Sequence, residues 1–208
     1  MSQTRAQLVK GLSITSASAD VITVDSSGNV GINKTSPVKD LDVTGEIRCS
    51  TGILFGTDTA AANTLDDFEE GTWTPNLTST APGTGSFSAG LNNGGFYTKI
   101  GKRVMYQFNL AGTWTVGTAG GSAVIDGLPF TNAAATDRPG NSTYSPVVVT
   151  YNDAFDLSSG FVLIGGLIVP GTSGLRVYAE SNTIMVTIPI SDAATTINIH
   201  AGGSYEVA

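Results

Sequence analysis

The stretch VMYQFNL, residues 104–110, decides the fold class of this 208-residue chain. Its large apolar residues fall on every second position, and Met105, Gln107 and Asn109 lie between them. Because successive side chains of a β-strand point to opposite faces, this period of two predicts a strand with one buried and one exposed face. Such a strand needs neighbours to complete a sheet, so the segments around it decide the architecture.

Apolar segments of similar character recur between residues 73 and 208, separated by Gly, Asn and Ser turns. They are residues 96–100, 113–116, 123–125, 147–149, 161–169, 175–178, 184–190 and 197–199. Roughly eight to ten short strands with turns between them are typical of β-sandwiches and jelly rolls. The pattern therefore predicts an all-β protein whose residues 73–208 form a β-sandwich head of the jelly-roll type.

A smaller β-rich region precedes this head. The strings ITV (22–24) and VGI (30–32) flank the turn SSGN (26–29), which predicts a hairpin, and LDV (41–43) repeats the alternation. A unit of this size cannot bury its own apolar face, and three identical copies around an axis are one arrangement that would cover it. Residues 21–60 are therefore predicted to form a short, intertwined trimeric β shaft.

The composition argues against several classes of function. Charged residues make up 13% of the chain, against about 25% in an average soluble domain. The formal net charge of −7 disfavours nucleic-acid binding, because contacts to phosphate need a surplus of Lys and Arg. No run reaches the ~18 apolar residues of a membrane span, and Cys49 has no partner for an intrachain disulfide. We expect a chain that is made in a cytoplasm and stays soluble.

Between residues 51 and 80 the chain is acidic and contains no Lys or Arg. The acids are Asp58, Asp66, Asp67, Glu69 and Glu70. Residues 61–72 are predicted to be an acidic linker, with docking onto a basic partner or a metal site at a trimer axis as alternatives. Paired carboxylates are also what glycoside hydrolysis requires, but hydrolases take them from a walled cleft and not from consecutive positions of a linker. No catalytic residue is predicted.

The other candidate residues are isolated. His200 has no second His and no Cys partner, so neither a zinc site nor a catalytic triad is predicted, and we expect no enzyme, no metal and no cofactor. Trp73 is predicted to be a packing anchor. Tyr144 and Tyr151 flank the end of the longest predicted loop, residues 131–145, and loops of that length are often functional. Because aromatic rings with a polar tip are common at binding surfaces, these two tyrosines are the predicted binding contacts.

Several strings along the chain are distinctive. They are VDSSGNVGINKTSP (24–37), LDVTGEI (41–47), EEGTWTP (69–75), GFYTKIG (95–101), IDGLPF (125–130) and GSY (203–205). Together they make the chain similar to the tail fibre and receptor-binding tip proteins of tailed bacteriophages, of a cyanophage-like or marine-phage-like kind.

The resemblance implies a homotrimeric tail fibre or tip on the virion, made in the host cytoplasm and exposed on the particle. Residues 1–20 would dock onto other virion proteins, and residues 21–60 would form the shaft. Residues 73–208 would attach to a polysaccharide or protein of the bacterial host surface, with Tyr144 and Tyr151 as the receptor contacts.

Two alternatives stay open. The same fold would serve a capsid-decorating spike or a tail collar protein that has no receptor role. The other alternative is a weak polysaccharide hydrolase that uses Asp67 and Glu69 of the acidic stretch.

Overall fold

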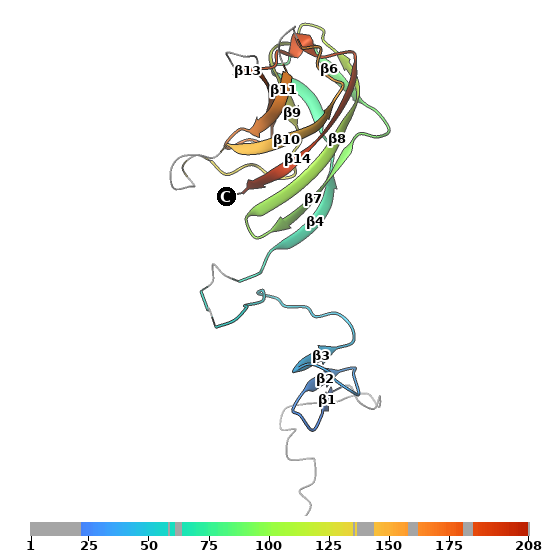
Figure 1. Ribbon diagram of the computed structural model, residues 1–208, viewed down its shortest axis with the longest axis vertical. Helices are drawn as coiled ribbons and strands as arrows, with labels where there is room; N and C mark the ends of the chain where they lie inside the picture. The colour runs from blue at the N-terminus through green and yellow to red at the C-terminus, as the bar shows by residue number, and fades with distance from the viewer. Residues whose placement is uncertain are drawn as a thin grey trace, which may run out of the picture. The chain divides into compact units, whose positions relative to one another are not determined.

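The computed structural model describes residues 22–57, 59–60, 64–134, 136, 144–157, 162–180 and 185–207 (Figure 1). The expected attachment segment, residues 1–20, lies outside them. The chain divides after Thr51 into two compact units. Among the described residues strands predominate and no α-helix occurs, which confirms the predicted all-β fold class. Accordingly, the described part contains no helix with the length and apolarity to cross a membrane.

The first unit is a three-stranded sheet of very short strands. β1 (Ile22–Val24) and β2 (Val30–Ile32) pair as the predicted antiparallel hairpin, and β3 (Leu41–Val43) lies parallel to β2. The Asp25 carboxylate holds the turn, because it accepts hydrogen bonds from the backbone N–H and the side-chain amide of Asn29, both at 2.9 Å. The backbone bond from Asn29 is the main reason that the pKa of Asp25 is lowered, since it stabilises the charged carboxylate.

This first unit has almost no apolar core among its described residues. Val24, Val38 and Leu41 expose 65%, 73% and 57% of their surface, and only Gly31 and Pro37 are buried. Burial of apolar surface contributes about 25 cal/mol per Å², and these side chains forgo most of it. A sheet of this size is marginal in water, so its stability requires a further apolar surface.

The second unit contains one antiparallel sheet of eleven strands. They are β4 (Phe68–Trp73), β5 (Asn76–Ala81), β6 (Ser86–Ala89), β7 (Gly94–Ile100), β8 (Arg103–Thr115), β9 (Gly120–Asp126), β10 (Ser145–Asn152), β11 (Val162–Ile168), β12 (Leu175–Glu180), β13 (Met185–Thr187) and β14 (Thr196–Glu206). The hydrogen-bonded path runs β4-β7-β8-β14-β10-β11-β12-β9-β5, with β6 added to β8 and β13 to β12. A 3-10 turn, η4 (Ile190–Asp192), precedes β14.

The sheet curls so strongly that its two ends approach each other (Figure 1). β5, at one end of the path, contacts β8 and β6 as well as its own partner β9. β14 pairs with β8 along its whole length and with β10 on its other edge. Because β10 in turn pairs with β11, hydrogen bonds join β4, β7, β8 and β14 to β11, β12, β9 and β5. One continuous sheet therefore surrounds the core. The predicted jelly-roll sandwich would instead have two separate sheets.

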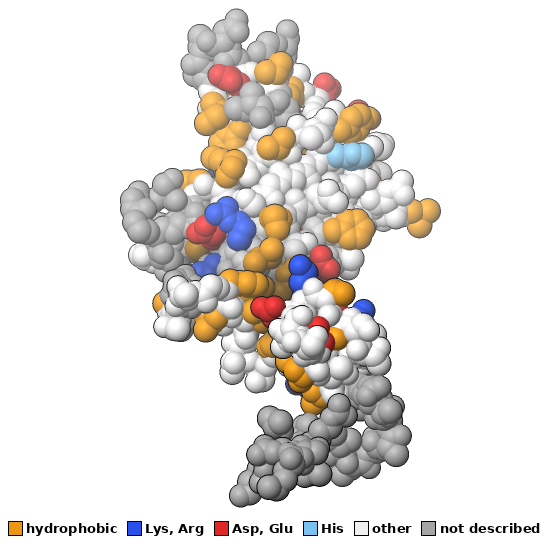
Figure 2. All heavy atoms as spheres, turned by 60° about the horizontal axis from the view of Figure 1, so that its bottom comes forward, with side chains coloured by type: hydrophobic (Ala, Val, Ile, Leu, Met, Phe, Trp, Pro, Cys, Tyr) orange, Lys and Arg blue, Asp and Glu red, His pale blue; other side chains and the backbone are white. Residues whose placement is uncertain are grey.

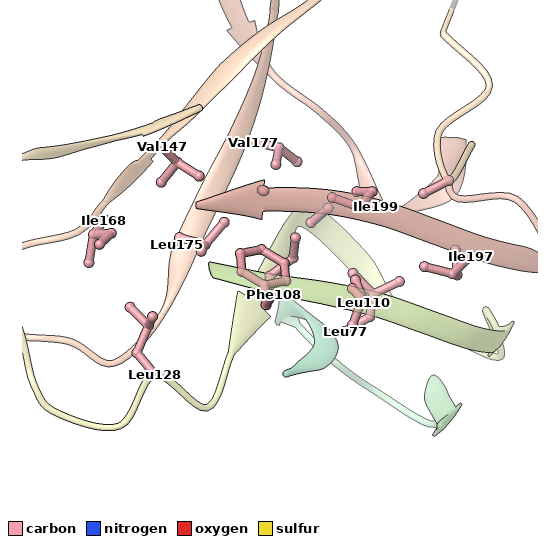
Figure 3. Close-up of a cluster of buried hydrophobic side chains, with 14 of the residues drawn as sticks. Leu77, Phe108, Leu110, Leu128, Val147, Ile168, Leu175, Val177, Ile197 and Ile199 are labelled. Atoms are coloured by element: carbon pink, nitrogen blue, oxygen red, sulfur yellow. The ribbon is translucent and has the colours of Figure 1, made fainter. Parts of the chain in front are cut away.

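The core lies inside this curl. The apolar residues at alternate positions of the stretch 104–110 are at most 5% exposed, whereas Met105 between them exposes 44%. The predicted two-faced strand is thus confirmed in β8. Leu77, Leu175 and Ile199 approach it from β5, β12 and β14, as Figure 3 shows. Burial of these side chains from four strands is the main favourable term that holds the curl closed.

Both tryptophans belong to this core. Trp73 is 8% exposed and meets Phe108 edge to face, with ring centroids 5.2 Å apart, so it is the packing anchor that the sequence predicted. Trp114 is 4% exposed. Neither ring is therefore available for stacking on a ligand.

Two buried tyrosines, Tyr106 and Tyr205, meet edge to face with ring centroids 5.6 Å apart. Burial raises the pKa of both hydroxyls, that of Tyr205 to about 12. Their hydrogen bonds differ. The Tyr205 hydroxyl accepts a bond from the Phe130 N–H at 3.1 Å, whereas the buried Tyr106 hydroxyl has no partner in the described structure.

This difference predicts opposite effects of the same substitution. Tyr205→Phe should lower the free energy of unfolding by about 1 kcal/mol, because it leaves the Phe130 N–H without an acceptor. Tyr106→Phe should leave it unchanged or raise it, because it removes a hydroxyl that has lost its water without gaining a partner. Urea unfolding followed by circular dichroism measures both, and an equal loss in the two variants would contradict the assignment.

Candidate functional site

The two predicted contact residues lie far apart. Tyr144 directly precedes β10, and Tyr151 lies near the other end of that strand. They expose 55% and 47% of their surface. A strand rises about 3.3 Å per residue, so roughly 20 Å separate them. The structure therefore does not bring Tyr144 and Tyr151 into one site. Tyr151 lies beside His200 of β14, with ring centroids 5.4 Å apart.

A groove of about 630 Å³ opens next to His200. Side chains and backbone of β4, β7, β8 and β14 form its floor, and the loop before β7 forms a wall. Its lining residues are Thr72, Trp73, Thr74, Leu91, Asn92, Asn93, Gly94, Gly95, Phe96, Gln107, Phe108, Asn109, Thr150, His200 and Ala201.

The strand register places this groove on the outer face of the sheet. One register row is buried and faces the core: Trp73, Gly95, Phe108 and Ala201. The rows on either side of it point outward, because side chains alternate between faces. These outward residues are Thr72, Phe96 and Gln107 in one row, and Gly94, Asn109 and His200 in the other. Trp73 also belongs to the lining of the groove, although its ring packs in the core.

The groove is hollow because glycines occupy outward positions. Gly94 stands opposite Asn109, and Gly202 stands opposite Gln107, so two places on the outer face carry no side chain. A Cβ at Gly202 would lie 2.8 Å from the Tyr106 carbonyl oxygen, whereas a Cβ at Gly94 would meet nothing within 4 Å. Gly202 is therefore required by packing, and Gly94 is not.

Asparagine side chains fix the wall of the groove to the sheet. Asn93 donates from its amide to the Pro75 carbonyl at 2.9 Å and accepts from the Ala111 N–H at 3.0 Å. Asn109 donates to the carbonyl of Asn92 at 3.0 Å. These bonds hold the loop that carries the exposed Leu91.

The groove has an uncharged, mixed character. Phe96 exposes 64% of its surface, and the exposed His200, two strands away on β14, also belongs to the lining. Amide and hydroxyl groups supply the polar part of the lining, which contains no Asp, Glu, Lys or Arg. Figure 2 shows the histidine (pale blue) at the surface among uncharged polar atoms and apolar side chains. Such a site can stack flat apolar faces and bind hydroxyl groups, but it offers no paired carboxylates for acid–base chemistry.

Sequence reasoning missed this groove because its residues come from distant segments. Phe96 lies opposite Gln107, and His200 lies opposite Asn109, only through the register of β7, β8 and β14. The available signal was an aromatic residue at an outward position of a strand, between the polar neighbours of the same face. His200 is an exposed residue of β14.

The acidic stretch has a structural role. Asp67 forms an ion pair with Lys99, which is 8% exposed, and Glu69 accepts a hydrogen bond from the Tyr97 hydroxyl. That bond to Glu69 raises the pKa of Tyr97. Glu69 and Glu70 lie within β4 and not in the predicted linker 61–72, because pairing with β7 begins at Phe68. Charged residues are common on an edge strand such as β4.

The remaining acidic candidates gather into no metal site within the part of the chain that the structure describes. Asp58 lies outside the described residues. Across the described segments, no three or more His, Cys, Asp or Glu side chains gather closely enough to hold a metal ion.

The strings that carry the resemblance to tail fibres converge on one cluster. Tyr97 meets Phe130 edge to face at 5.3 Å, and the Lys99 ammonium lies 5.6 Å from the centre of the same ring. Glu69 and Asp67 bind these two β7 side chains, and Tyr205 accepts from the Phe130 N–H. The strings 69–75, 95–101, 125–130 and 203–205 therefore share a packing role at one end of the sheet.

The Lys99–Asp67 pair predicts unequal effects of two acidic substitutions. Asp67→Ala should lower the free energy of unfolding by about 2 kcal/mol, because it leaves the buried ammonium of Lys99 without this carboxylate. Glu70→Ala, on the exposed outer face of β4, is the matched control and should change it by less than about 0.5 kcal/mol. Chemical denaturation measures both, and a loss in the Glu70 variant equal to that in the Asp67 variant would contradict the specific role of the pair.

Comparisons with known proteins give one informative likeness. No family model matches the chain, and no curated protein matches it. The crystal structure of the Dettilon tailspike protein (gp208) is similar, with a TM-score of 0.50 and 17% sequence identity. The match covers 67% of this chain and 24% of the tailspike chain, so it corresponds to about a quarter of that protein. At this identity, the likeness shows a shared fold.

Proposed function

We propose that this chain is a structural, tail-associated component of a bacteriophage virion that attaches the particle to its bacterial host. The observation that carries the proposal is the likeness of its fold to the Dettilon tailspike protein. The strings that resemble tail fibres agree with it, and four of them build one packing cluster of the head.

The first unit supports a homotrimer. Its strands leave Val24 and Leu41 exposed, and a small sheet of this kind needs a covering surface. Identical copies around an axis would cover each of these faces with its own counterpart. The trimer also suits attachment, because three heads bind a repetitive surface with an avidity well above the affinity of one head.

The head supports attachment more than cleavage. Its outer groove offers an aromatic ring, amides and hydroxyl groups, and its lining has no carboxylate. Asp67 and Glu69, the residues of the hydrolase alternative, are engaged with Lys99 and Tyr97. The same head fold would also suit a capsid-decorating spike or a collar protein, so location on the particle is the decisive test.

The shared shaft predicts a mass in solution near three times the 21.3 kDa of the chain. Val24→Asp, at a side chain that is 65% exposed in the first unit, should lower this mass toward that of a monomer, because a charge would enter the shared apolar face. Val162→Asp, at a side chain that is 63% exposed in the head, is the matched control and should keep the mass of the trimer. Light scattering measures all three proteins, and a monomeric mass for the unaltered chain would contradict the trimer.

Attachment predicts that the purified chain competes with phage particles that carry it. Preincubation of host cells with the chain should reduce adsorption of those particles, and immunogold labelling should mark their tails. Adsorption is measured as free particles over time. Label confined to the capsid would contradict the tail location, and unchanged adsorption on cells saturated with the chain would contradict the attachment role.

A further inference from the structure

We infer that the outer groove of the head binds a neutral oligosaccharide segment. The inference rests on the proposed attachment function and names the ligand class and the contact residues, which lie in β7, β8 and β14. The volume of the groove, about 630 Å³, falls within the ~300–1,000 Å³ typical of small-ligand sites.

The aromatic part of the groove suits the apolar face of a sugar ring. Phe96 is 64% exposed and lies on β7, between Thr72 of the edge strand β4 and Gln107 of β8. An exposed aromatic ring on a strand with polar neighbours presents an apolar platform, and pyranose rings present C–H groups to such a platform. On the far side, His200 and Tyr151 form a second pair of rings.

The polar part suits hydroxyl groups. The exposed amide of Gln107 offers both a donor and an acceptor beside Phe96, and Thr72 adds a hydroxyl. Thr150 donates to the His200 carbonyl at 3.2 Å and keeps acceptor capacity. Sugar hydroxyls both donate and accept hydrogen bonds, so amides and hydroxyls around an aromatic ring complement them without any charge.

The absence of charge decides the class of sugar. No Asp, Glu, Lys or Arg occurs among the described lining residues, so an anionic glycan would find no cation and a cationic ligand no carboxylate. The formal net charge of the chain, −7, further disfavours polyanions. Cleavage is disfavoured as well, because glycoside hydrolysis generally uses two carboxylates that flank the bond.

The shape of the surface suits a chain and not a single sugar. A second hollow of about 220 Å³ shares Phe96 and Gln107 with the groove and continues past Thr98 and Met105. The combined depression crosses neighbouring strands, which are about 4.8 Å apart. It therefore has room for more than one ring of a linear polysaccharide, with Phe96 at the junction.

Gly94 allows the groove to be filled without disturbing the fold. A Cβ at this position meets nothing within 4 Å, so a valine there would project into the groove. Gly120, at the start of β9 and outside the groove, has equally open surroundings and provides the matched control. Because valine suits a strand better than glycine does, both variants should melt at or above the temperature of the unaltered chain.

The test measures binding of the full chain to immobilised polysaccharides. The neutral probes are dextran, mannan, galactan and the uncharged fraction of a host-cell surface extract, and the anionic probes are polygalacturonate and hyaluronate. We expect binding to at least one neutral probe, little changed between about 0.05 and 0.5 M NaCl. Gly94→Val should weaken it at least tenfold, Phe96→Ala should weaken it several-fold, and Gly120→Val should leave it unchanged.

Several outcomes would overturn the inference. They are binding to the anionic probes only, binding to none of the probes, equal binding by the Gly94 and Gly120 variants, or a change of the mass in solution by Gly94→Val, which would make the groove a contact between copies. Failure of the attachment function is separate, since it requires that the unaltered chain leaves adsorption of phage to cells unchanged. If cells bind the Gly94 variant as tightly as the unaltered chain, the groove is refuted as the binding site and the attachment function is not.

Discussion

The antiparallel pairing of β8 with β14 is the constraint on which the head depends. It runs without interruption from Arg103 opposite Glu206 to Thr113 opposite Thr196, and an ion pair of 2.6 Å joins Arg103 and Glu206 at one end. This register places most large apolar residues of both strands on the core side, and leaves amides, small residues, Met105, His200 and the Arg103–Glu206 pair outside. A shift of one residue would exchange the two faces, so the core and the groove are set by the same hydrogen bonds.

The curled sheet carries a packing cluster at one end and the groove on its outer face. At one end, Lys99, Tyr97 and Phe130 close the core with the help of Asp67 and Glu69. Further along the outer face, Gly94 leaves open space in the groove. The strings that resemble tail fibres contribute to both places, since Tyr97 and Lys99 belong to the packing cluster and Phe96 of the same string lines the groove.

The alternation within the stretch 104–110 and the turn before Val30 are local patterns, and they predicted β8 and the hairpin correctly. The groove depends on contacts between segments that are far apart in sequence, and a single sequence does not contain their register. Tyr144 and Tyr151 illustrate the limit. Both adjoin the end of the same predicted loop, but Tyr144 precedes the extended strand β10 and Tyr151 lies near its far end. The sequence pattern predicts a linker at Glu69 and Glu70. The residues that pair with them and make this segment a strand lie in β7, which is distant in sequence.

Glycine has two different meanings on the outer face of this sheet. At Gly202 the neighbouring carbonyl of Tyr106 excludes any side chain, so the fold requires glycine there. At Gly94 the space is open and the residue lies in a strand, where glycine is less stable than a β-branched residue. The fold alone would favour a larger residue at 94. A larger residue at position 94 would fill the open volume next to Phe96, Asn109 and His200. The proposed binding surface therefore depends on a glycine that makes the strand less stable.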